Sequence, residues 1–310
     1  MRIPRRSRPL PALPALLLAS VLSVGTAGCS LPGGSDDGGD GTGLERALDA
    51  VPASAADQGM MYRDVRTARR LVAKDPKLYR GLDGFGILEV VQHGYTGGSV
   101  RADWGFDAKD VKTSVTVGNS SLLTGEFDTD SVGRAMKKQG YRATRTEHGT
   151  RYEKGSGDGT FEVSDTARAA KRSDIALGLA TPDTSLRDDE AYTAVADCLG
   201  DVYEASFYAK REDADVVLLA IGGRLGKDGT SSSETLCART ASRKAADATA
   251  ARLREKTAPG QRYAGSKVTV GEGDTPMVTM TWKNSTESGL RPSDNDRTSE
   301  LPRVLVWGRG

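Results

Sequence analysis

The first 28 residues of the chain, which end directly before a cysteine, decide which part is left to fold. Segment 2–8 holds four arginines, segment 10–24 is an apolar run, and small residues follow it. This layout is typical of a secretory signal peptide. The apolar run contains Pro11 and Pro14 and is shorter than the ~20 residues that a spanning helix needs, so it predicts transient export and not a permanent membrane span.

The leader ends in Thr26-Ala27-Gly28-Cys29, which looks like the cleavage and acylation signal of bacterial lipoproteins, although Thr26 stands where Leu or Val is commoner. We therefore predict cleavage after Gly28 and a diacylglycerol on the thiol of Cys29. Two acyl chains on one residue meet the requirement for stable anchoring. The prediction places the protein on the extracytoplasmic face of a cell membrane. Arg5-Arg6 is typical of the twin-arginine route, but the residues after this pair fit that pattern badly, so the sequence leaves open whether export uses this route or the general secretory one.

Changes of composition along the chain predict its segments. Residues 30–43 consist mainly of Gly, Asp and Ser and cannot bury apolar surface, so we expect a flexible tether there. Folding is expected to begin near Val51. The predicted segments are a signal peptide (1–28), a tether (29–50), a first α+β unit (51–181), a second α+β unit (182–285) and a tail (286–310).

Charge and aromatic content limit the classes of partner. The formal net charge of +1 includes the four leader arginines, so residues 29–310 carry −3 (1 − 4). This balance argues against a nucleic-acid partner and against an electrostatic hold on the membrane. Aromatic residues make up only 5% of the chain, which leaves few rings for stacking on sugars or bases.

Two further cysteines, Cys198 and Cys237, form an even pair in an exported chain. The extracytoplasmic compartment is oxidising and neither cysteine lies in a Cys-x-x-Cys motif, so we predict a structural disulfide and no redox activity. Two buried free thiols or a reactive pair are the alternatives. A disulfide across this separation stabilises a fold by ~3–4 kcal/mol in the chain-entropy account. We expect it to join the two helices of the second unit.

Hydrophobic periodicity predicts one order of elements twice: helix, strand, strand, helix, strand, strand. Asp128 has the position of a helix N-cap and Gly200 that of a helix stop. In the first half we expect helices over 62–71, 85–92 and 129–139, a helical turn at 106–110, and strands over 111–117, 121–127, 141–146, 150–154, 161–165 and 175–179. In the second half we expect helices over 188–199 and 232–256 and strands over 202–209, 215–221, 267–270 and 278–282. Residues 303–307 are expected to add a final strand to this unit, with a docking peptide as the alternative.

We therefore predict an α+β fold of two similar helix–strand–strand–helix–strand–strand units with antiparallel sheets, each sheet covered by helices on one face. Residue identity between the halves is slight, so the similarity concerns the order of elements. A superposition of 106–155 on 188–283 would test it.

The chain offers few candidates for catalysis. His93 and His148 are its only histidines, each stands before a glycine, and we expect both in solvated loops. The stretch Gly222–Thr230 partly resembles a phosphate loop, but Ile221 and Asp228 occupy two positions where the motif needs Gly and Ser or Thr. We expect a structural connection there.

Three acidic groups are the candidates for metal ligands: Asp36-Asp37, Asp188-Asp189-Glu190 and Asp294-Asn295-Asp296. None has the oxygen spacing of a calcium loop. Solvated charge accounts for each of them, and in the second group the charges suit a helix N-terminus. The sequence predicts no metal and no cofactor.

Several short sequences resemble those of one family. The lipid-attachment signal, the acidic Gly-rich tether and Asp197-Cys198-Leu199-Gly200-Asp201 resemble cell-envelope lipoproteins of high-GC actinobacteria. Trp104–Asp107, Gly125–Asp128 and Gly140-Tyr141 belong to the same resemblance, which covers most of the chain after the leader. It implies a location in the envelope and carries no functional residues.

These observations favour a membrane-anchored, non-enzymatic binding or interaction module whose partner is a protein or another envelope component. One alternative is an envelope hydrolase or transferase, which would need a deep pocket with His93 or His148 beside a carboxylate. Another is a solute-binding or sensor lipoprotein with its cleft between the two units. The sequence specifies no small-molecule ligand.

Overall fold

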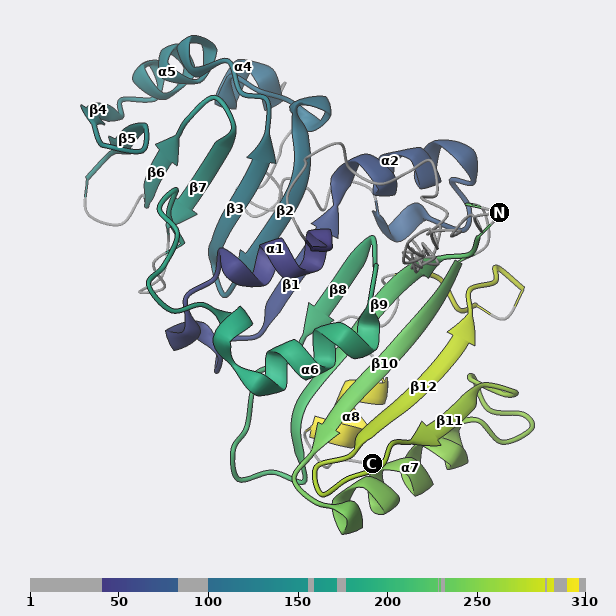
Figure 1. Cartoon of the computed structure of the whole chain (residues 1–310). Helices are drawn as coiled ribbons and strands as arrows, with labels where there is room; N and C mark the ends of the chain where they lie inside the picture. Colours follow the sequence, from purple (N-terminus) through teal and green to yellow (C-terminus); the bar gives the residue numbers. More distant parts are fainter. Residues whose placement is uncertain are drawn as a thin grey trace, which may run out of the picture. The chain divides into compact units, whose positions relative to one another are not determined.

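The computed structural model of the chain describes residues 41–82, 100–155, 159–171, 177–227, 229, 232–287, 289–292 and 300–306. Within these ranges twelve strands form one sheet (Figure 1). The strands of the first half are β1 (Met60–Asp64), β2 (Val111–Val117), β3 (Ser120–Gly125), β4 (Arg142–Arg145), β5 (Thr150–Glu153), β6 (Thr160–Val163) and β7 (Ala167–Lys171). Those of the second half are β8 (Glu204–Phe207), β9 (Val216–Leu225), β10 (Ser232–Thr240), β11 (Lys267–Val270) and β12 (Met277–Lys283).

The strands follow the order β11-β12-β10-β9-β8-β1-β2-β3-β7-β6-β5-β4, and neighbouring strands are antiparallel. β1 lies in the middle of this order, paired with β2 on one side and with β8 on the other. The β1–β8 pair therefore joins the two halves of the chain in a single sheet.

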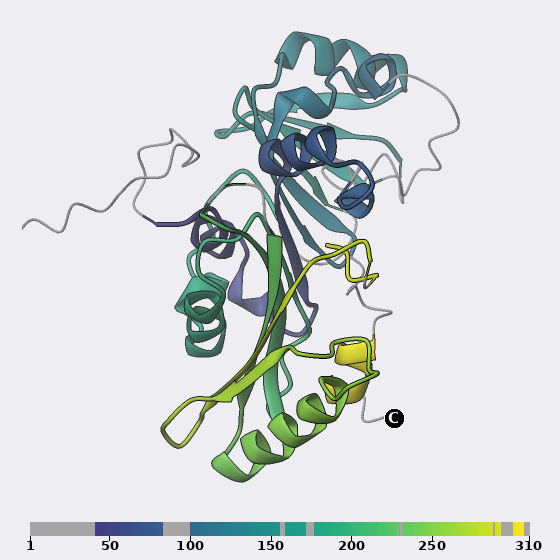
Figure 2. The same cartoon turned by 90° about the vertical axis from the view of Figure 1, so that its right-hand side faces the viewer.

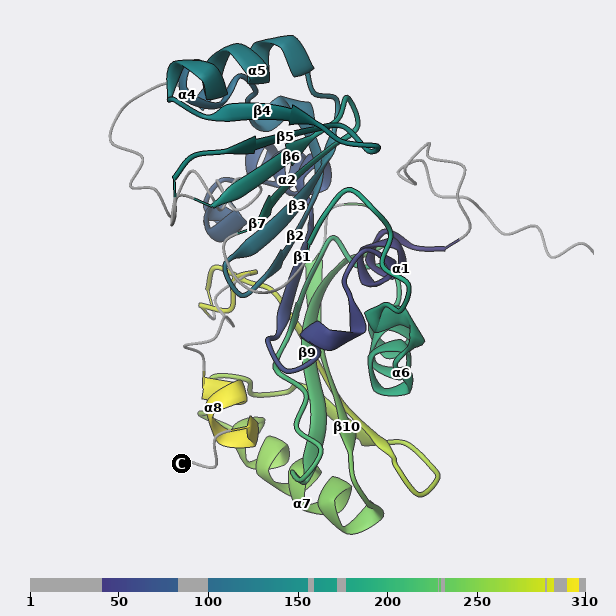
Figure 3. The ribbon, with the colours of Figure 1, turned by 90° about the vertical axis from the view of Figure 1, so that its left-hand side faces the viewer.

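Helices cover both faces of the sheet. Figures 2 and 3 show α1 (Gly43–Asp49) and α6 (Glu190–Leu199) on the face opposite to α7 (Arg243–Lys256) and α8 (Glu300–Val306). The alternation of side chains along a strand separates the two faces, because Leu236 of β10 packs with α7 whereas the next residue, Cys237, packs with α6. The remaining helices are α2 (Val65–Lys74), α4 (Val100–Trp104) and α5 (Thr129–Lys138), and the 3₁₀ turns are η1 (Ala53–Ala55), η2 (Arg80–Leu82), η3 (Ala108–Asp110) and η4 (Leu186–Asp188).

Capping residues set the ends of several helices. The side chain of Asp128 accepts hydrogen bonds from backbone N–H groups of the first turn of α5, and Asp189 does the same for α6. α6 ends at Gly200, whose φ of 63° is readily adopted by glycine. The predicted helices over 129–139 and 188–199 are thereby confirmed.

The α+β class with antiparallel pairing is confirmed, and so are three predicted hairpins: β2–β3, β4–β5 and β11–β12. Residues 106–155 contain the expected order of elements. The second half differs because β10 stands as an additional strand between β9 and α7. In the sheet, β12 pairs directly with β10, whereas β7 and β6 separate β5 from β3. The strand orders of 106–155 and 188–283 therefore differ.

Two predicted elements of the second half are wrong. The helix predicted over 232–256 begins only at Arg243, because residues 232–240 form β10 with partners on both sides. A strand buried on both faces lacks the alternation that distinguishes it from a helix. The strand predicted at 303–307 overlaps α8, where Leu301 and Leu305 are buried at the spacing of one helical turn.

Three predictions near the N-terminal side also need correction. The prediction that folding begins near Val51 is wrong, because α1 precedes it: Thr42 and Glu45 form a capping box and Leu48 is fully buried. The helix predicted over 62–71 begins at Val65, after β1. β7 was not predicted as a strand. The predicted helix over 85–92 lies outside the described residues, as do 175 and 176 of the strand predicted over 175–179. Residues 177–179 are described and do not belong to a strand.

The largest hydrophobic core contains residues of both halves. Val115 and Leu122 of the first half pack in one cluster with Ala205 and Leu218 of the second, beneath α1 and α6. This shared core lies on the face of the β1–β8 junction where the disulfide also lies.

Candidate functional site

Several residues singled out from the sequence lie outside the described part of the chain. They include Cys29, so its lipidation stays a prediction, and also His93, Asp36-Asp37 and Asp294–Asp296. Among the described residues, none of the helices has the length and apolar character needed to cross a membrane.

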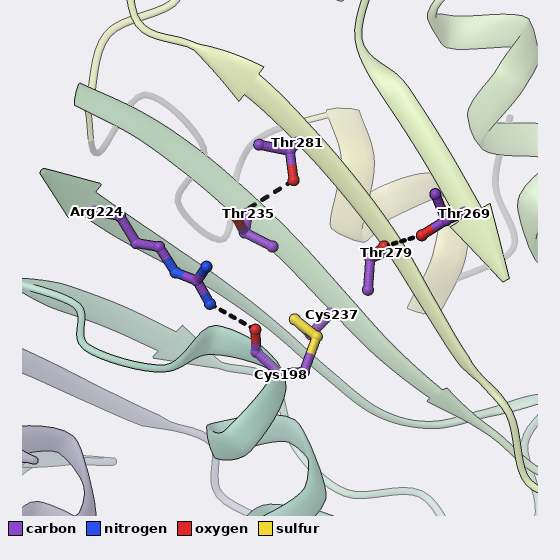
Figure 4. The surroundings of a disulfide bond; sticks show 7 residues. All are labelled: Cys198, Arg224, Thr235, Cys237, Thr269, Thr279 and Thr281. Atoms are coloured by element: carbon purple, nitrogen blue, oxygen red, sulfur yellow. Dashed lines mark hydrogen bonds between the residues drawn. A yellow bond between two sulfur atoms is a disulfide. The ribbon is translucent and has the colours of Figure 1, made fainter. Parts of the chain in front are cut away.

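The predicted disulfide is present. Cys198 at the end of α6 and Cys237 of β10 are joined, with their Cα atoms 6.2 Å apart (Figure 4). The bond therefore connects a helix to a strand. The expected link between two helices is wrong, because Cys237 lies in β10 and not in the helix predicted over 232–256. Beside it, Nη2 of Arg224 donates to the carbonyl oxygen of Cys198 at 2.6 Å and satisfies a group at the end of α6.

The remaining candidates from the sequence have structural places. His148 is exposed between β4 and β5. Gly222 belongs to β9, and β10 follows the connection where a phosphate loop would need a helix. Asp189 caps α6 and accepts from Nζ of Lys210 at 2.7 Å, while Asp188 accepts from the backbone N–H of Ser185 in the capping box of η4. In the described ranges no cluster of His, Cys, Asp and Glu could hold a metal ion.

A row of polar side chains, which the sequence analysis missed, crosses the middle of the sheet. The strand register sets Arg63 opposite Glu204, Glu204 opposite Gly223, Gly223 opposite Glu234, and Glu234 opposite Trp282. Residues directly opposite each other lie on the same face of a sheet. The topology thus brings together charged residues from β1, β8 and β10.

Two close contacts hold this row. Nη2 of Arg63 lies 2.7 Å from Oε2 of Glu204, and Nε1 of Trp282 donates to Oε2 of Glu234 at 2.9 Å. Glu204 is 8% exposed and Glu234 is 2% exposed. Both carboxyl groups are therefore buried in the sheet, and each contacts a side chain of the neighbouring strand.

Tyr203 packs over the same row. A Cβ atom at Gly223 would lie 2.7 Å from Cζ of Tyr203, so the glycine makes room for the ring. Burial raises the pKa of Tyr203, and the nearby charges of Glu204 and Glu234 raise it further. The phenol therefore stays protonated at neutral pH. A charged residue within a run of small and apolar ones, as at Glu234, was the available sequence signal for this row.

Arg168 of β7 is a second buried cation. Its guanidinium carbon lies 5.0 Å from the ring centroids of both Trp104 and Phe106, and 4.7 Å from that of Phe161. Such cation–π contacts are strongest where water is excluded, and Arg168 is 0% exposed. Since Trp104 belongs to α4, this contact holds α4 against the sheet.

A shallow pocket of about 260 Å³ lies between α4 and α5. The residues of α5 that line the pocket are three or four positions apart, so they lie along one side of the helix. This side is next to the one that faces the core. α4 approaches closely because Gly105 has no side chain: a Cβ there would lie 2.5 Å from the backbone of Ser131. The lining residues are Arg101, Ala102, Gly105, Ser131, Arg134, Ala135 and Lys138.

The pocket is lined by cations, with carboxylates at its margin. Nε and Nη2 of Arg101 lie 2.8 Å from carboxylate oxygens of Asp107 and Asp110, respectively, and the hydrogen bond to Asp107 raises the pKa of Arg101. Nη2 of Arg134 donates to Oγ of Ser131 at 2.8 Å. The lining holds no imidazole, thiol or carboxylate for acid–base or nucleophilic chemistry. Its composition suits the binding of an anionic group.

Comparisons with known proteins identify no family. No protein-family model matches the chain, and no curated protein matches its sequence. Two solved structures of TP0453 are similar in fold, each with 11% sequence identity. Crystal form I has a TM-score of 0.43 and covers 79% of this chain and 96% of its own; crystal form IV has a TM-score of 0.39 and covers 80% and 98%.

Proposed function

We propose that the protein is a lipoprotein, anchored through Cys29 to the extracytoplasmic face of a cell membrane, whose folded part is a non-enzymatic binding module of the envelope. The leader and the resemblance to actinobacterial envelope lipoproteins support the location. The disulfide agrees with it, because such bonds persist in oxidising compartments.

The cationic pocket between α4 and α5 is the observation that carries the binding role. It offers Arg134 and Lys138 around a floor that includes Ala135, while the guanidinium of Arg101 is bound to Asp107 and Asp110 at its margin. The buried carboxyl groups of the central row lie in the sheet interior, and His148 lies on an exposed connection. The described residues thus support recognition of an anionic partner better than catalysis.

Anchoring is tested with Cys29→Ala in intact cells. We expect wild-type protein in the membrane fraction with incorporated fatty acid, and loss of both properties in the variant. A double variant, Cys198→Ala with Cys237→Ala, is the control because it replaces the other two cysteines and keeps Cys29. Retention of Cys29→Ala in the membrane with fatty acid still attached would refute the proposed anchor.

The binding role is tested by mild crosslinking in cells, affinity capture and mass spectrometry, with wild-type protein and Cys29→Ala in parallel. We expect an envelope component to be captured with the anchored form and to be depleted with the unanchored one. Turnover of an envelope substrate by the purified chain would contradict the non-enzymatic assignment.

A further inference from the structure

Six exposed cationic side chains gather at one end of the sheet, around its edge strand β4. Figures 1 and 3 show α5 and β4 together at this end. We call these side chains the basic end: Arg134, Lys137 and Lys138 of α5, Arg142 and Arg145 of β4, and Lys154, which follows β5.

The positive charge of the basic end exceeds the negative charge around it. The exposed acids on these elements, on their connections and at the N-cap of α5 are Asp128, Asp130, Glu147 and Glu153, four against six cations. Arg151 of β5 is left out because its Nη2 lies 2.5 Å from Glu162. Residues 41–310 carry no net charge, because Asp36, Asp37 and Asp40 of the predicted tether account for the −3 of residues 29–310. The positive excess at the basic end is therefore balanced by acidic residues elsewhere in the chain.

The cations project in several directions around the edge. Arg142 and Arg145 are three residues apart in β4 and therefore lie on opposite faces of the strand. α5 covers one of these faces, where a Cβ at Gly133 would lie 3.1 Å from the hydroxyl of Tyr152. Charged edge strands resist pairing with other chains, but that need does not account for the cations of α5. A broad anionic surface meets all three elements at once.

We propose that the basic end docks on the anionic phosphate headgroups of the membrane that carries the lipid anchor. The proposal rests on the proposed anchoring at Cys29. Clusters of four to eight Lys and Arg side chains beside a membrane are attracted to anionic lipids, each cation adding up to roughly fivefold in binding.

The length of chain before the fold permits this contact. Residues 30–42 span at most about 45 Å when fully extended. β4 lies six strands from β1, which α1 contacts, and six strand spacings amount to about 29 Å. A lipid on Cys29 therefore leaves the basic end within reach of the same membrane.

The test uses residues 29–310 with Cys29→Ser, so that binding does not depend on the lipid. The fraction of this protein that sediments with vesicles is measured for two compositions: phosphatidylcholine alone, and equimolar phosphatidylcholine and phosphatidylglycerol. The variant combines Arg134→Gln, Lys138→Gln, Arg142→Gln and Arg145→Gln. The control makes the same change of charge on exposed cations elsewhere: Lys244→Gln, Arg252→Gln, Lys267→Gln and Lys283→Gln.

We expect binding to the anionic vesicles only, at least about tenfold weaker for the basic-end variant than for the control, and lost near 1 M salt, where the Debye length is ~3 Å. Far-UV circular dichroism verifies that both variants are folded. Equal loss in the two variants, equal binding to both kinds of vesicle, or binding of soluble polyglutamate but not of vesicles would overturn the proposal. Because Cys29 is replaced in this protein, a negative result in the vesicle experiment does not contradict the proposed lipid anchor. The comparison of wild-type protein with Cys29→Ala in cells tests the anchor separately.

Discussion

The pair of Arg63 and Glu204 shows what burial does to individual charges. Their side chains are 7% and 11% exposed, and they come from β1 and β8, the strands that join the halves. Removing two charges from water costs several kcal/mol for each ion, and their mutual attraction offsets this only while both are present. Loss of one partner is therefore expected to lower the stability of the fold by more than the intact pair contributes to it.

We predict that Arg63→Met lowers the free energy of unfolding by ~3–5 kcal/mol, because it leaves Glu204 buried beside an apolar side chain. The double variant, Arg63→Met with Glu204→Met, is expected to recover most of that loss. Urea denaturation of the single and double variants measures both values. Additive losses in the double variant would contradict the interpretation of the two residues as a coupled pair.

At Asp189, which is partly buried, hydrogen bonds to the carboxylate outweigh the cost of burying its charge. Burial raises the pKa of its carboxyl group, but hydrogen bonds from Lys210 and from backbone N–H groups of α6 outweigh burial and lower the pKa below its ordinary value. A carboxyl group whose pKa is lowered by folding stabilises the fold above its unfolded pKa, about 4. That stabilisation is lost as the pH falls through the folded-state pKa.

Asp189→Asn tests this charge, because Asn also serves as an N-cap. We predict that the variant loses ~0.5–1 kcal/mol of unfolding free energy at pH 7, a value discounted for solvent screening, and almost nothing near pH 2. Urea denaturation across this pH range gives the difference. A constant difference at every pH would show that the charge of Asp189 does not contribute.

At the scale of elements, the contact of α4 with α5 depends on one glycine. Gly105 has a φ of 79°, which non-glycine residues rarely adopt, and its Cα faces the backbone of Ser131 without space for a side chain. The cationic pocket lies between these two helices, so the same glycine determines the width of the pocket.

We predict that Gly105→Ala costs at least ~2 kcal/mol of unfolding free energy, from backbone strain and from separation of the helices. Gly260→Ala is the matched control, because its φ of 84° is similar but nothing lies within 4 Å of an added Cβ. The control should lose only ~1 kcal/mol. Thermal unfolding compares the two, and equal losses would show that the contact with Ser131 is unimportant.

At the scale of the whole molecule, the halves share a sheet and a core. The β1–β8 pair links them through backbone hydrogen bonds, and the cluster beneath α1 and α6 includes Val115 from one half and Leu218 from the other. Separation of the halves would expose this cluster to water. The described part of the fold is therefore expected to unfold as one cooperative unit.

Hydrogen exchange of the wild-type protein followed by mass spectrometry tests this cooperativity. We predict that the slowest amides of β2–β3 and of β9–β10 exchange with the same free energy and the same dependence on denaturant. Two distinct free energies would mean that the halves open independently despite their common sheet.

The sequence by itself determined the local features of this protein. Asp128 and Asp189 mark helix starts, Gly200 marks a helix end, and the hairpins lie where turn residues separate two strands. In each case the deciding hydrogen bonds join residues that are close in the chain. The pairing of Cys198 with Cys237 also followed, because only two cysteines remain once Cys29 is assigned to the lipid.

Only the tertiary structure decided that β10 is a strand, that one sheet joins the halves, and that Arg63, Glu204 and Glu234 lie in one row. β10 has partners on both sides and is buried on both faces, so its sequence lacks the alternation of a half-exposed strand. Arg63 and Glu204 are 141 positions apart in the chain. Strand pairing over such separations depends on burial across the whole sheet, which no local pattern encodes.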